Sequence, residues 1–229
     1  MLDDSGPNAG AHASTTAQRE NPMSEPLLSD EIFVVDDDPM VGDLLNVALG
    51  MEGYHVTSFN DGESFSAAAR ARVPACVILD VFMPGKSGLD ILKTINAHDY
   101  PAPIIVMSGK ASIAMAVEAV KNGAFDIIEK PFSLESIVAR VRDAAEAWAR
   151  RRSGGIESLP MEFPGCQPLT QREAEVLAEI AAASSNKEAG RRLGISPRTV
   201  EVHRARIMMK LGAKNTADLV RIALTHRKH

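Results

Sequence analysis

The sequence predicts an α/β chain, with a doubly wound, five-stranded parallel sheet followed by a small all-helical unit. Three observations support this prediction. Short apolar runs alternate with amphipathic runs five times between residues 31 and 151, as in a parallel sheet with helices on both faces. A stretch rich in basic residues, glycine and proline interrupts the alternation at 150–165. Four short runs with helix-start signals then follow.

The expected strands are short and apolar, and they cover residues 32–35, 55–59, 76–79, 104–107 and 126–129. The amphipathic runs between and after them predict helices at 39–51, 62–72, 88–97, 111–122 and 133–151. Gly123 is expected to end the fourth helix as a left-handed cap. The face of the first helix that should be buried consists of Val41, Leu44, Leu45 and Ala48.

Start signals define the helices of the second unit, which are expected at about 171–183, 186–193, 197–211 and 216–227. Residues 170–173 (Thr-Gln-Arg-Glu) and 185–188 (Ser-Asn-Lys-Glu) both have the spacing of a capping box. Ser196 precedes Pro197, which puts an N-cap before a proline at the first helical position. Gly194 lies in the short turn before this helix, as in a helix-turn-helix.

The composition is that of a globular protein, with 45% apolar, 24% charged and only 4% aromatic residues. No run of eighteen apolar residues occurs, and the N-terminus lacks a basic segment followed by an apolar one. We therefore expect neither a membrane span nor a secretory signal, and a cytoplasmic location. Cys76 and Cys166 are too few to form a disulfide framework.

Four regions are expected along the chain: a disordered tail at 1–28, the sheet domain at 29–151, a linker at 152–165 and the helical domain at 166–229. Met23 is an alternative translation start within the tail. The net charge is −11 over residues 1–164 and +6 over residues 165–229. Such a split suggests an acidic module beside a module with a polyanionic partner, although a basic surface is often merely solvated.

Polar residues follow four of the five expected strands. They are Asp36, Asp37 and Asp38 after the first strand, Asp80 after the third, Ser108 after the fourth and Lys130 after the fifth. Because the carboxyl ends of parallel strands meet at one edge of a sheet, these side chains should converge. Each has a simpler interpretation when taken alone, as a helix cap, a solvated turn or a surface residue.

Carboxylates gathered in one place repel each other unless a cation compensates. Carboxylate and backbone carbonyl oxygens suit Mg²⁺, which also keeps waters and takes phosphate oxygens. A strand-end carboxylate beside Mg²⁺ and a lysine can attack phosphorus and form an aspartyl phosphate. Asp80 would then be the nucleophile, Lys130 would neutralise the phosphoryl oxygens, and Ser108 could donate a hydrogen bond.

Residues 30–150 resemble the receiver domain of two-component response regulators, which implies a flavodoxin-like fold. The resemblance is carried by Val34-Val35-Asp36-Asp37, Ile78-Leu79-Asp80 with Met83-Pro84-Gly85 and Gly88, Met107-Ser108-Gly109, and Glu129-Lys130-Pro131-Phe132. It implies that Asp80 accepts a phosphoryl group from a sensor histidine kinase. It further implies a Mg²⁺ site made by Asp37, Asp80 and the Phe82 carbonyl, with Asp36 acting through water.

The same resemblance makes Ser108 the switch hydroxyl, Lys130 the phosphate partner and the Lys130–Pro131 peptide bond cis. There is one departure from the family pattern. Such receivers usually carry Tyr or Phe three residues before the lysine, and this chain has Ile127. The phosphoryl chemistry does not need that ring, but the resemblance does not tell how activation passes along the fourth helix and fifth strand.

The helix expected at 197–211 has an apolar face made by Val200, Ile207 and Leu211. This face should pack on the two preceding helices, at Val176, Leu177, Ile180, Ala189 and Leu193. In a helix-turn-helix, the second helix of the pair enters the major groove of DNA. A helical bundle whose basic face binds another protein is the simpler alternative. His203 lacks partners at metal-ligand spacing, so we expect a phosphate contact or helix packing.

Residues 166–226 resemble the LuxR-type DNA-binding domain, through Leu169-Thr-Gln-Arg-Glu173, Ser185-Asn-Lys-Glu188, Leu193-Gly-Ile-Ser196 and the helix that follows. The resemblance directs Glu201, Val202 and Ala205 toward bases. Glu201 would read cytosine or pair with a neighbouring arginine. It places another set near DNA phosphates: Lys187, Arg198, Thr199, Arg204, Arg206 and Lys210. The order of the modules and the run 195–205 resemble the FixJ/NodW branch, which contains activators of nitrogen fixation, nodulation and aromatic catabolism.

Together these features predict a transcription regulator and not an enzyme. Phosphorylation of Asp80 should favour a homodimer paired through residues of about 111–130, which addresses two half-sites in promoter DNA and, as an activator, works with RNA polymerase. The alternative is a regulator that ignores phosphorylation and is controlled by a ligand or partner protein. An aspartyl-phosphate phosphatase is disfavoured because Phe82 stands where a second acid is usual, and an RNA-binding output because no RNA-binding motif is present.

Overall fold

The computed structural model describes residues 30–109, 112–152, 163 and 166–226. The predicted tail at 1–28 and most of the predicted linker at 152–165 lie outside the described residues. Within the described part, no helix is long and apolar enough to cross a membrane.

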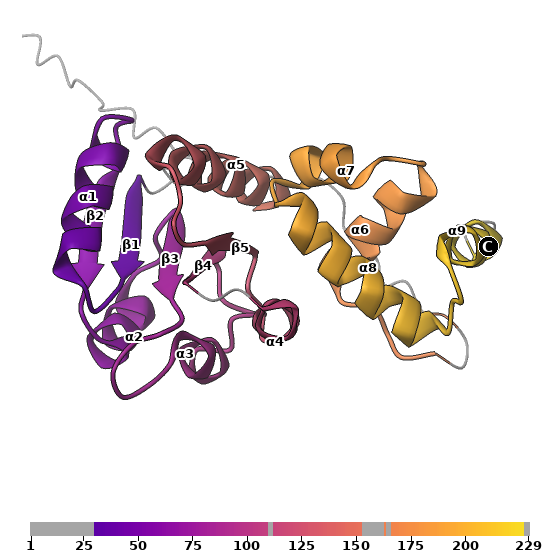
Figure 1. Ribbon diagram of the computed structural model, residues 1–229, viewed down its shortest axis with the longest axis horizontal. Helices are drawn as coiled ribbons and strands as arrows, with labels where there is room; N and C mark the ends of the chain where they lie inside the picture. Colours follow the sequence, from indigo (N-terminus) through magenta and orange to yellow (C-terminus); the bar gives the residue numbers. More distant parts are fainter. Residues whose placement is uncertain (1–29, 110–111, 153–162, 164–165, 227–229) are drawn as a thin grey trace, which may run out of the picture.

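Five parallel strands form one sheet in the order β2-β1-β3-β4-β5. Their bounds are β1 Glu31–Val35, β2 His55–Phe59, β3 Cys76–Asp80, β4 Ile104–Ser108 and β5 Asp126–Glu129. The sheet is the predicted doubly wound type, with β3 at its centre between β1 and β4 and helices on both faces (Figure 1). The central strands read as continuous apolar runs because both of their faces are buried.

Alternate residues of each strand serve two separate cores. Val34 and Ile78 belong to the core under α1 Pro39–Gly50 and α5 Leu134–Arg152. Phe33 and Leu79 belong to the core under α2 Gly62–Ala71, α3 Gly88–Thr94 and α4 Ile113–Lys121. Because successive side chains of a strand point to opposite faces of the sheet, each strand contributes to both cores.

Two predictions about these helices were wrong. α3 ends at Thr94 and not at residue 97, since Asn96 has a positive φ of 51° that ends the helical path. On α1, Leu44 is 47% exposed, whereas Leu45 and Leu49 are fully buried. Leu45 and Leu49 lie four residues apart and form the buried face of α1, so Leu44 lies on the solvent side.

The second unit has the predicted helices, α6 Gln171–Ala181, α7 Asn186–Leu193, α8 Pro197–Leu211 and α9 Thr216–His226. Both predicted capping boxes are formed, at the starts of α6 and α7. Ser196 caps α8 by accepting the Thr199 N–H at 3.0 Å, and Gly194 ends α7 with a φ of 68°. The predicted face of α8 is buried with residues of α6, α7 and α9 in one apolar cluster.

The helical unit packs directly on the sheet domain. α8 lies against α4, and its N-terminal end reaches β5, where Asp126 accepts the Ser196 backbone N–H. Val202 of α8 is 6% exposed and belongs to the apolar cluster that contains Ala116 and Ala119 of α4. The Arg172 guanidinium of α6 stacks on the Phe125 ring at 4.6 Å.

Candidate functional site

The carboxyl ends of the central strands bring two carboxylates and one lysine together. Asp36 directly follows β1, Asp80 is the last residue of β3, and Lys130 directly follows β5. Lys130 Nζ lies 2.8 Å from Asp36 Oδ2 and 2.7 Å from Asp80 Oδ1. Both carboxylates are nearly inaccessible, with 4% and 3% of their surface exposed. This convergence is the one that the strand ends predict.

Both oxygens of Asp80 have partners, because Oδ2 accepts the Phe82 backbone N–H at 2.7 Å. Burial raises the pKa of Asp80, and the Asp36 charge adds to this, while Lys130 and the Phe82 N–H oppose it. Burial also disfavours the Lys130 ammonium, but its hydrogen bonds to Asp36 and Asp80 raise the pKa of Lys130 above its ordinary value. The site therefore places the Lys130 ammonium directly beside two buried carboxylates.

The three consecutive aspartates have different surroundings. The Asp36 carboxylate points into the site, and its Oδ1 accepts the Asp38 N–H at 3.0 Å. Asp38 caps α1 by accepting the Met40 N–H at 2.9 Å. Asp37 is exposed between them. Only Asp38 therefore has the helix-cap role that is the simple interpretation of such residues.

The donor atoms at this edge suit Mg²⁺. Among the described residues, no three His, Cys, Asp or Glu side chains converge closely enough to hold a metal by themselves. Mg²⁺ does not need such a cage, because it commonly takes one or two carboxylates and completes its shell with carbonyls and waters. The buried Asp36 and Asp80 carboxylates carry one more negative charge than Lys130 neutralises, so a divalent cation fits the electrostatics.

The remaining predicted residues frame this group. Ser108 is fully buried at the end of β4, and its carbonyl accepts the Lys130 N–H at 2.8 Å. The Lys130–Pro131 peptide bond is cis, as the resemblance to receivers implies. Gly88 is required because a Cβ at this position would lie 2.2 Å from the Asp80 carbonyl oxygen. Ile127 is 5% exposed and packs in the core under α4.

The residues expected at DNA divide into three groups. Lys187, Glu201 and Ala205 are exposed. Thr199 and Val202 are buried, with 0% and 6% exposure, because the sheet domain covers them. The other members, Arg198, Arg204, Arg206 and Lys210, are partly exposed. In this arrangement the structure does not present all of the candidate DNA residues to solvent.

Arg206 and Lys210 have a buried partner, Glu173, that the sequence does not reveal. Lys210 Nζ lies 2.6 Å from Glu173 Oε2, and Arg206 Nη2 lies 3.5 Å from Glu173 Oε1. Glu173 is fully buried in α6. Burial by itself would raise the pKa of Glu173, but hydrogen bonds from Lys210 and from the Thr170 N–H, with the Arg206 charge, lower it. These ion pairs tie α8 to α6.

Comparisons with known proteins identify both domains of the chain. Residues 32–142 match the response regulator receiver domain, and residues 167–223 match the bacterial regulatory proteins of the luxR family. The transcriptional regulatory protein FixJ of Bradyrhizobium diazoefficiens is 38% identical over 197 residues, which cover 84% of this chain and 94% of FixJ. The chain belongs to the FixJ-like response regulators.

Further relatives of this response regulator support the assignment. The transcriptional regulatory protein TdiR of Thauera aromatica is 36% identical over 198 residues, covering 86% of this chain and 87% of TdiR. A CheY-like receiver domain protein from Methanospirillum hungatei superposes with a TM-score of 0.51 at 21% identity, covering 54% of this chain and 98% of that structure. That structure shows the fold of the sheet domain alone. The regulator thus joins a receiver to a LuxR-type DNA-binding domain, as is typical of a transcription regulator.

Proposed function

We propose that this regulator is switched by phosphorylation of Asp80, with a sensor histidine kinase as the donor. The observation that carries the proposal is the position of the Lys130 ammonium, which contacts both Asp36 and Asp80 at the strand ends. This arrangement puts a positive charge where phosphoryl oxygens would arrive. The ligands proposed for Mg²⁺ are Asp37, Asp80 and the Phe82 carbonyl, with Asp36 acting through water. When bound, the ion would neutralise charge on the transferring group.

In the transfer step, an Asp80 carboxylate oxygen forms the new bond to phosphorus. The phosphorus–nitrogen bond of the donor phosphohistidine breaks, and its electron pair stays on the imidazole nitrogen, which takes up a proton. Lys130 exchanges its hydrogen bond to Asp80 for one to a phosphoryl oxygen, and the buried Ser108 hydroxyl donates to another.

The kinase would dock on the exposed apolar stripe of α1. Met40, Leu44, Val47 and Met51 are 76%, 47%, 64% and 84% exposed, and their spacing puts them on one side of the helix. A contiguous apolar stripe on a surface helix is typical of a partner-binding face. It starts beside the aspartates that follow β1, and Phe82, two residues after Asp80, is also 58% exposed. An apolar helical partner bound to this stripe would lie close to the phosphoacceptor.

The output would be a dimer bound to two half-sites of promoter DNA, which activates transcription together with RNA polymerase. Receiver pairing is proposed through residues of about 111–130, which include α4 and β5. In the structure α8 lies against α4 and reaches β5, so this surface is already occupied. Phosphorylation would release α8 and expose both the pairing surface and the DNA-binding face.

Sedimentation of wild type and Asp80→Asn with Mg²⁺ and acetyl phosphate tests this proposal, with intact-protein mass as a second readout. Wild type should gain the mass of one phosphoryl group and shift toward dimer, while Asp80→Asn should do neither. Phosphorylation without a dimer shift would keep the chemistry and refute the assembly model. If wild type takes up no phosphoryl group even from its kinase, control by a ligand or partner protein becomes the better account.

A further inference from the structure

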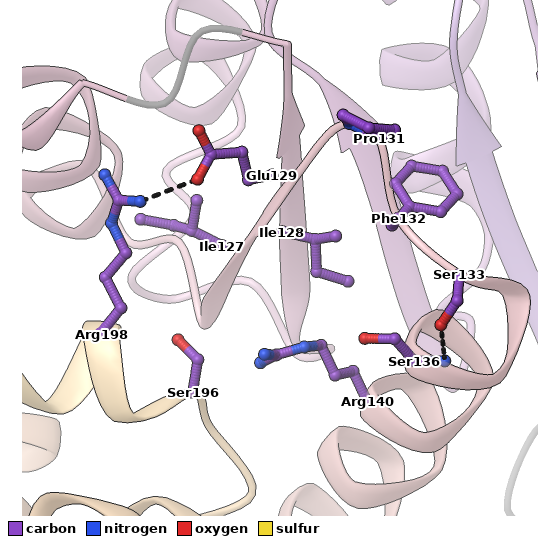
Figure 2. A pocket seen from close by; sticks show the side chains of 10 residues that line it. All are labelled: Ile127, Ile128, Glu129, Pro131, Phe132, Ser133, Ser136, Arg140, Ser196 and Arg198. Carbon is purple, nitrogen blue, oxygen red and sulfur yellow. Dashed lines mark hydrogen bonds and ion pairs between the residues drawn. The ribbon is translucent and has the colours of Figure 1, made fainter.

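The receiver holds the N-terminal end of α8 with two acidic side chains of β5. Asp126 Oδ1 accepts the Ser196 backbone N–H at 3.1 Å and the Thr199 hydroxyl at 2.6 Å. Three residues along β5, Glu129 Oε2 lies 3.0 Å from Arg198 Nη1 (Figure 2). Asp126 is only 1% exposed, so its contact with α8 excludes water.

An anion is expected at this end of α8 for physical reasons. The first backbone N–H groups of a helix have no partner within the helix, and the helix dipole puts partial positive charge there. The Thr199 hydroxyl and the Arg198 guanidinium add two more donors to the same end. Such a set of donors binds phosphate as readily as carboxylate.

Two of the residues that supply these donors, Arg198 and Thr199, are also residues that the similarity to LuxR-type domains places near DNA phosphates. We propose that Asp126 and Glu129 stand in for two DNA phosphates, so that the receiver and DNA compete for the same end of α8. This inference rests on the proposed function, in which α8 reads DNA. It goes further by naming the two side chains that keep DNA away and the groups on α8 that they occupy.

The rest of the interface makes the competition complete. Val202, expected at a base, is 6% exposed and packs with Ala116 and Ala119 of α4. His203, one residue further, is 3% exposed. A helix with this face covered cannot enter a major groove, because the groove must receive the same side chains. Receiver docking and DNA binding on α8 therefore exclude each other.

One strand connects this contact to the phosphoacceptor site. Asp126 and Glu129 belong to β5, and Lys130, which binds Asp80, is the next residue. A cavity of about 370 Å³ lies between β5, the start of α5 and α8, and Ile127, Glu129, Arg140 and Arg198 line part of it (Figure 2). Glu129 directly precedes Lys130 in the chain and borders this cavity. A shift of Lys130 toward a phosphoryl oxygen would therefore also move Glu129, which has room to move into the cavity. Transmission from Lys130 to Glu129 does not need an aromatic ring at position 127, where this chain has Ile127.

The test uses the full-length Asp126→Asn/Glu129→Gln variant, whose two changes keep side-chain size and leave α8 intact. Binding to a labelled mixed-sequence duplex of about 30 base pairs is measured at about 50 mM salt, where phosphate contacts dominate. Glu52→Gln is the matched control, because Glu52 is an exposed acid two residues after the end of α1. α1 lies at the end of the sheet domain away from α8 (Figure 1). Phosphorylated wild type is measured in parallel.

Domain opening has a native probe in Trp148, the only tryptophan of the chain. Trp148 lies beside a second cavity between the domains, opposite Arg172 and Arg206 of the helical unit. Its emission should shift to the red when the domains separate and water reaches the ring. Glu129→Gln alone, at a half-exposed position, provides a second variant if the buried Asp126 change impairs folding.

Unphosphorylated Asp126→Asn/Glu129→Gln should bind the duplex about tenfold more tightly than unphosphorylated wild type, because each charged hydrogen bond lost favours the open form. Its Trp148 emission should be red-shifted, and Glu52→Gln should match wild type in both measurements. Equal affinities of the variants and wild type would overturn the inference, whether or not Trp148 reports opening. If phosphorylation of wild type fails to raise affinity while the double variant binds tightly, the proposed function fails and this inference stands.

Discussion

The buried Glu173 offers a sharp test of how the DNA-binding domain is held together. Its carboxylate is fully buried, lies 2.6 Å from Lys210 Nζ and accepts the Thr170 N–H at 2.8 Å. Glu173→Gln removes the negative charge but keeps an acceptor for Thr170. Removing one partner of a buried ion pair costs about 3–5 kcal/mol, and the retained hydrogen bond reduces this to about 2–4 kcal/mol.

Thermal denaturation of the full chain, followed by far-ultraviolet circular dichroism, measures this loss. For a domain of 60–100 residues, about 2 kcal/mol corresponds to a fall in Tm of about 8–16 °C. Glu201→Gln is the control, because Glu201 is an exposed acid on α8 and its loss should cost at most about 0.5 kcal/mol. Equal Tm values for Glu173→Gln and Glu201→Gln would refute the reasoning.

The same residue predicts a pH dependence. The pKa of Glu173 is lowered in the folded state, since Lys210, Thr170 and Arg206 together outweigh the effect of burial. A lowered folded-state pKa gives stability that is complete above the ordinary glutamate pKa and is lost as the pH falls through the folded value. The difference in stability between wild type and Glu173→Gln should therefore be largest near neutral pH and shrink on acidification. A difference that grows on acidification would contradict this sign.

Three further predictions follow from the receiver. Gly88→Ala should slow phosphoryl uptake from acetyl phosphate, because its Cβ would meet the Asp80 carbonyl oxygen at 2.2 Å, whereas Gly50→Ala, with open space around its Cβ, should leave uptake unchanged. Leu45→Ala should lower the free energy of unfolding by about 2–5 kcal/mol in urea denaturation, since Leu45 is fully buried. Val47→Asp should weaken phosphotransfer from the sensor kinase about tenfold while uptake from acetyl phosphate stays unchanged, because Val47 is 64% exposed on the proposed docking stripe.

Local patterns in the sequence were sufficient to predict most of the fold. The strands β2 and β5 and the helices α7 and α8 have the predicted bounds, because their ends carry strong signals such as the Ser196 cap and the left-handed Gly194. The convergence of Asp36, Asp80 and Lys130 also follows from the sequence, since parallel topology brings strand ends together.

What the sequence could not reveal depends on packing between distant segments. Leu44 is as apolar as Leu45, and only the sheet under α1 decides which of them is buried. Lys210 looks like a phosphate-binding lysine until the buried Glu173 beside it is seen. Asp126 gives no signal at all, because its partners on α8 lie about seventy residues away, as the contact with Thr199 shows.

The most direct test of the central claim is DNA affinity as a function of Asp80 phosphorylation. Binding of the full-length protein to a labelled duplex is measured with and without acetyl phosphate and Mg²⁺, for wild type and for Asp80→Asn. The account predicts that the phosphodonor raises the affinity of wild type and leaves that of Asp80→Asn unchanged. An equal rise for both proteins, or no rise for phosphorylated wild type, would contradict control of this regulator through Asp80.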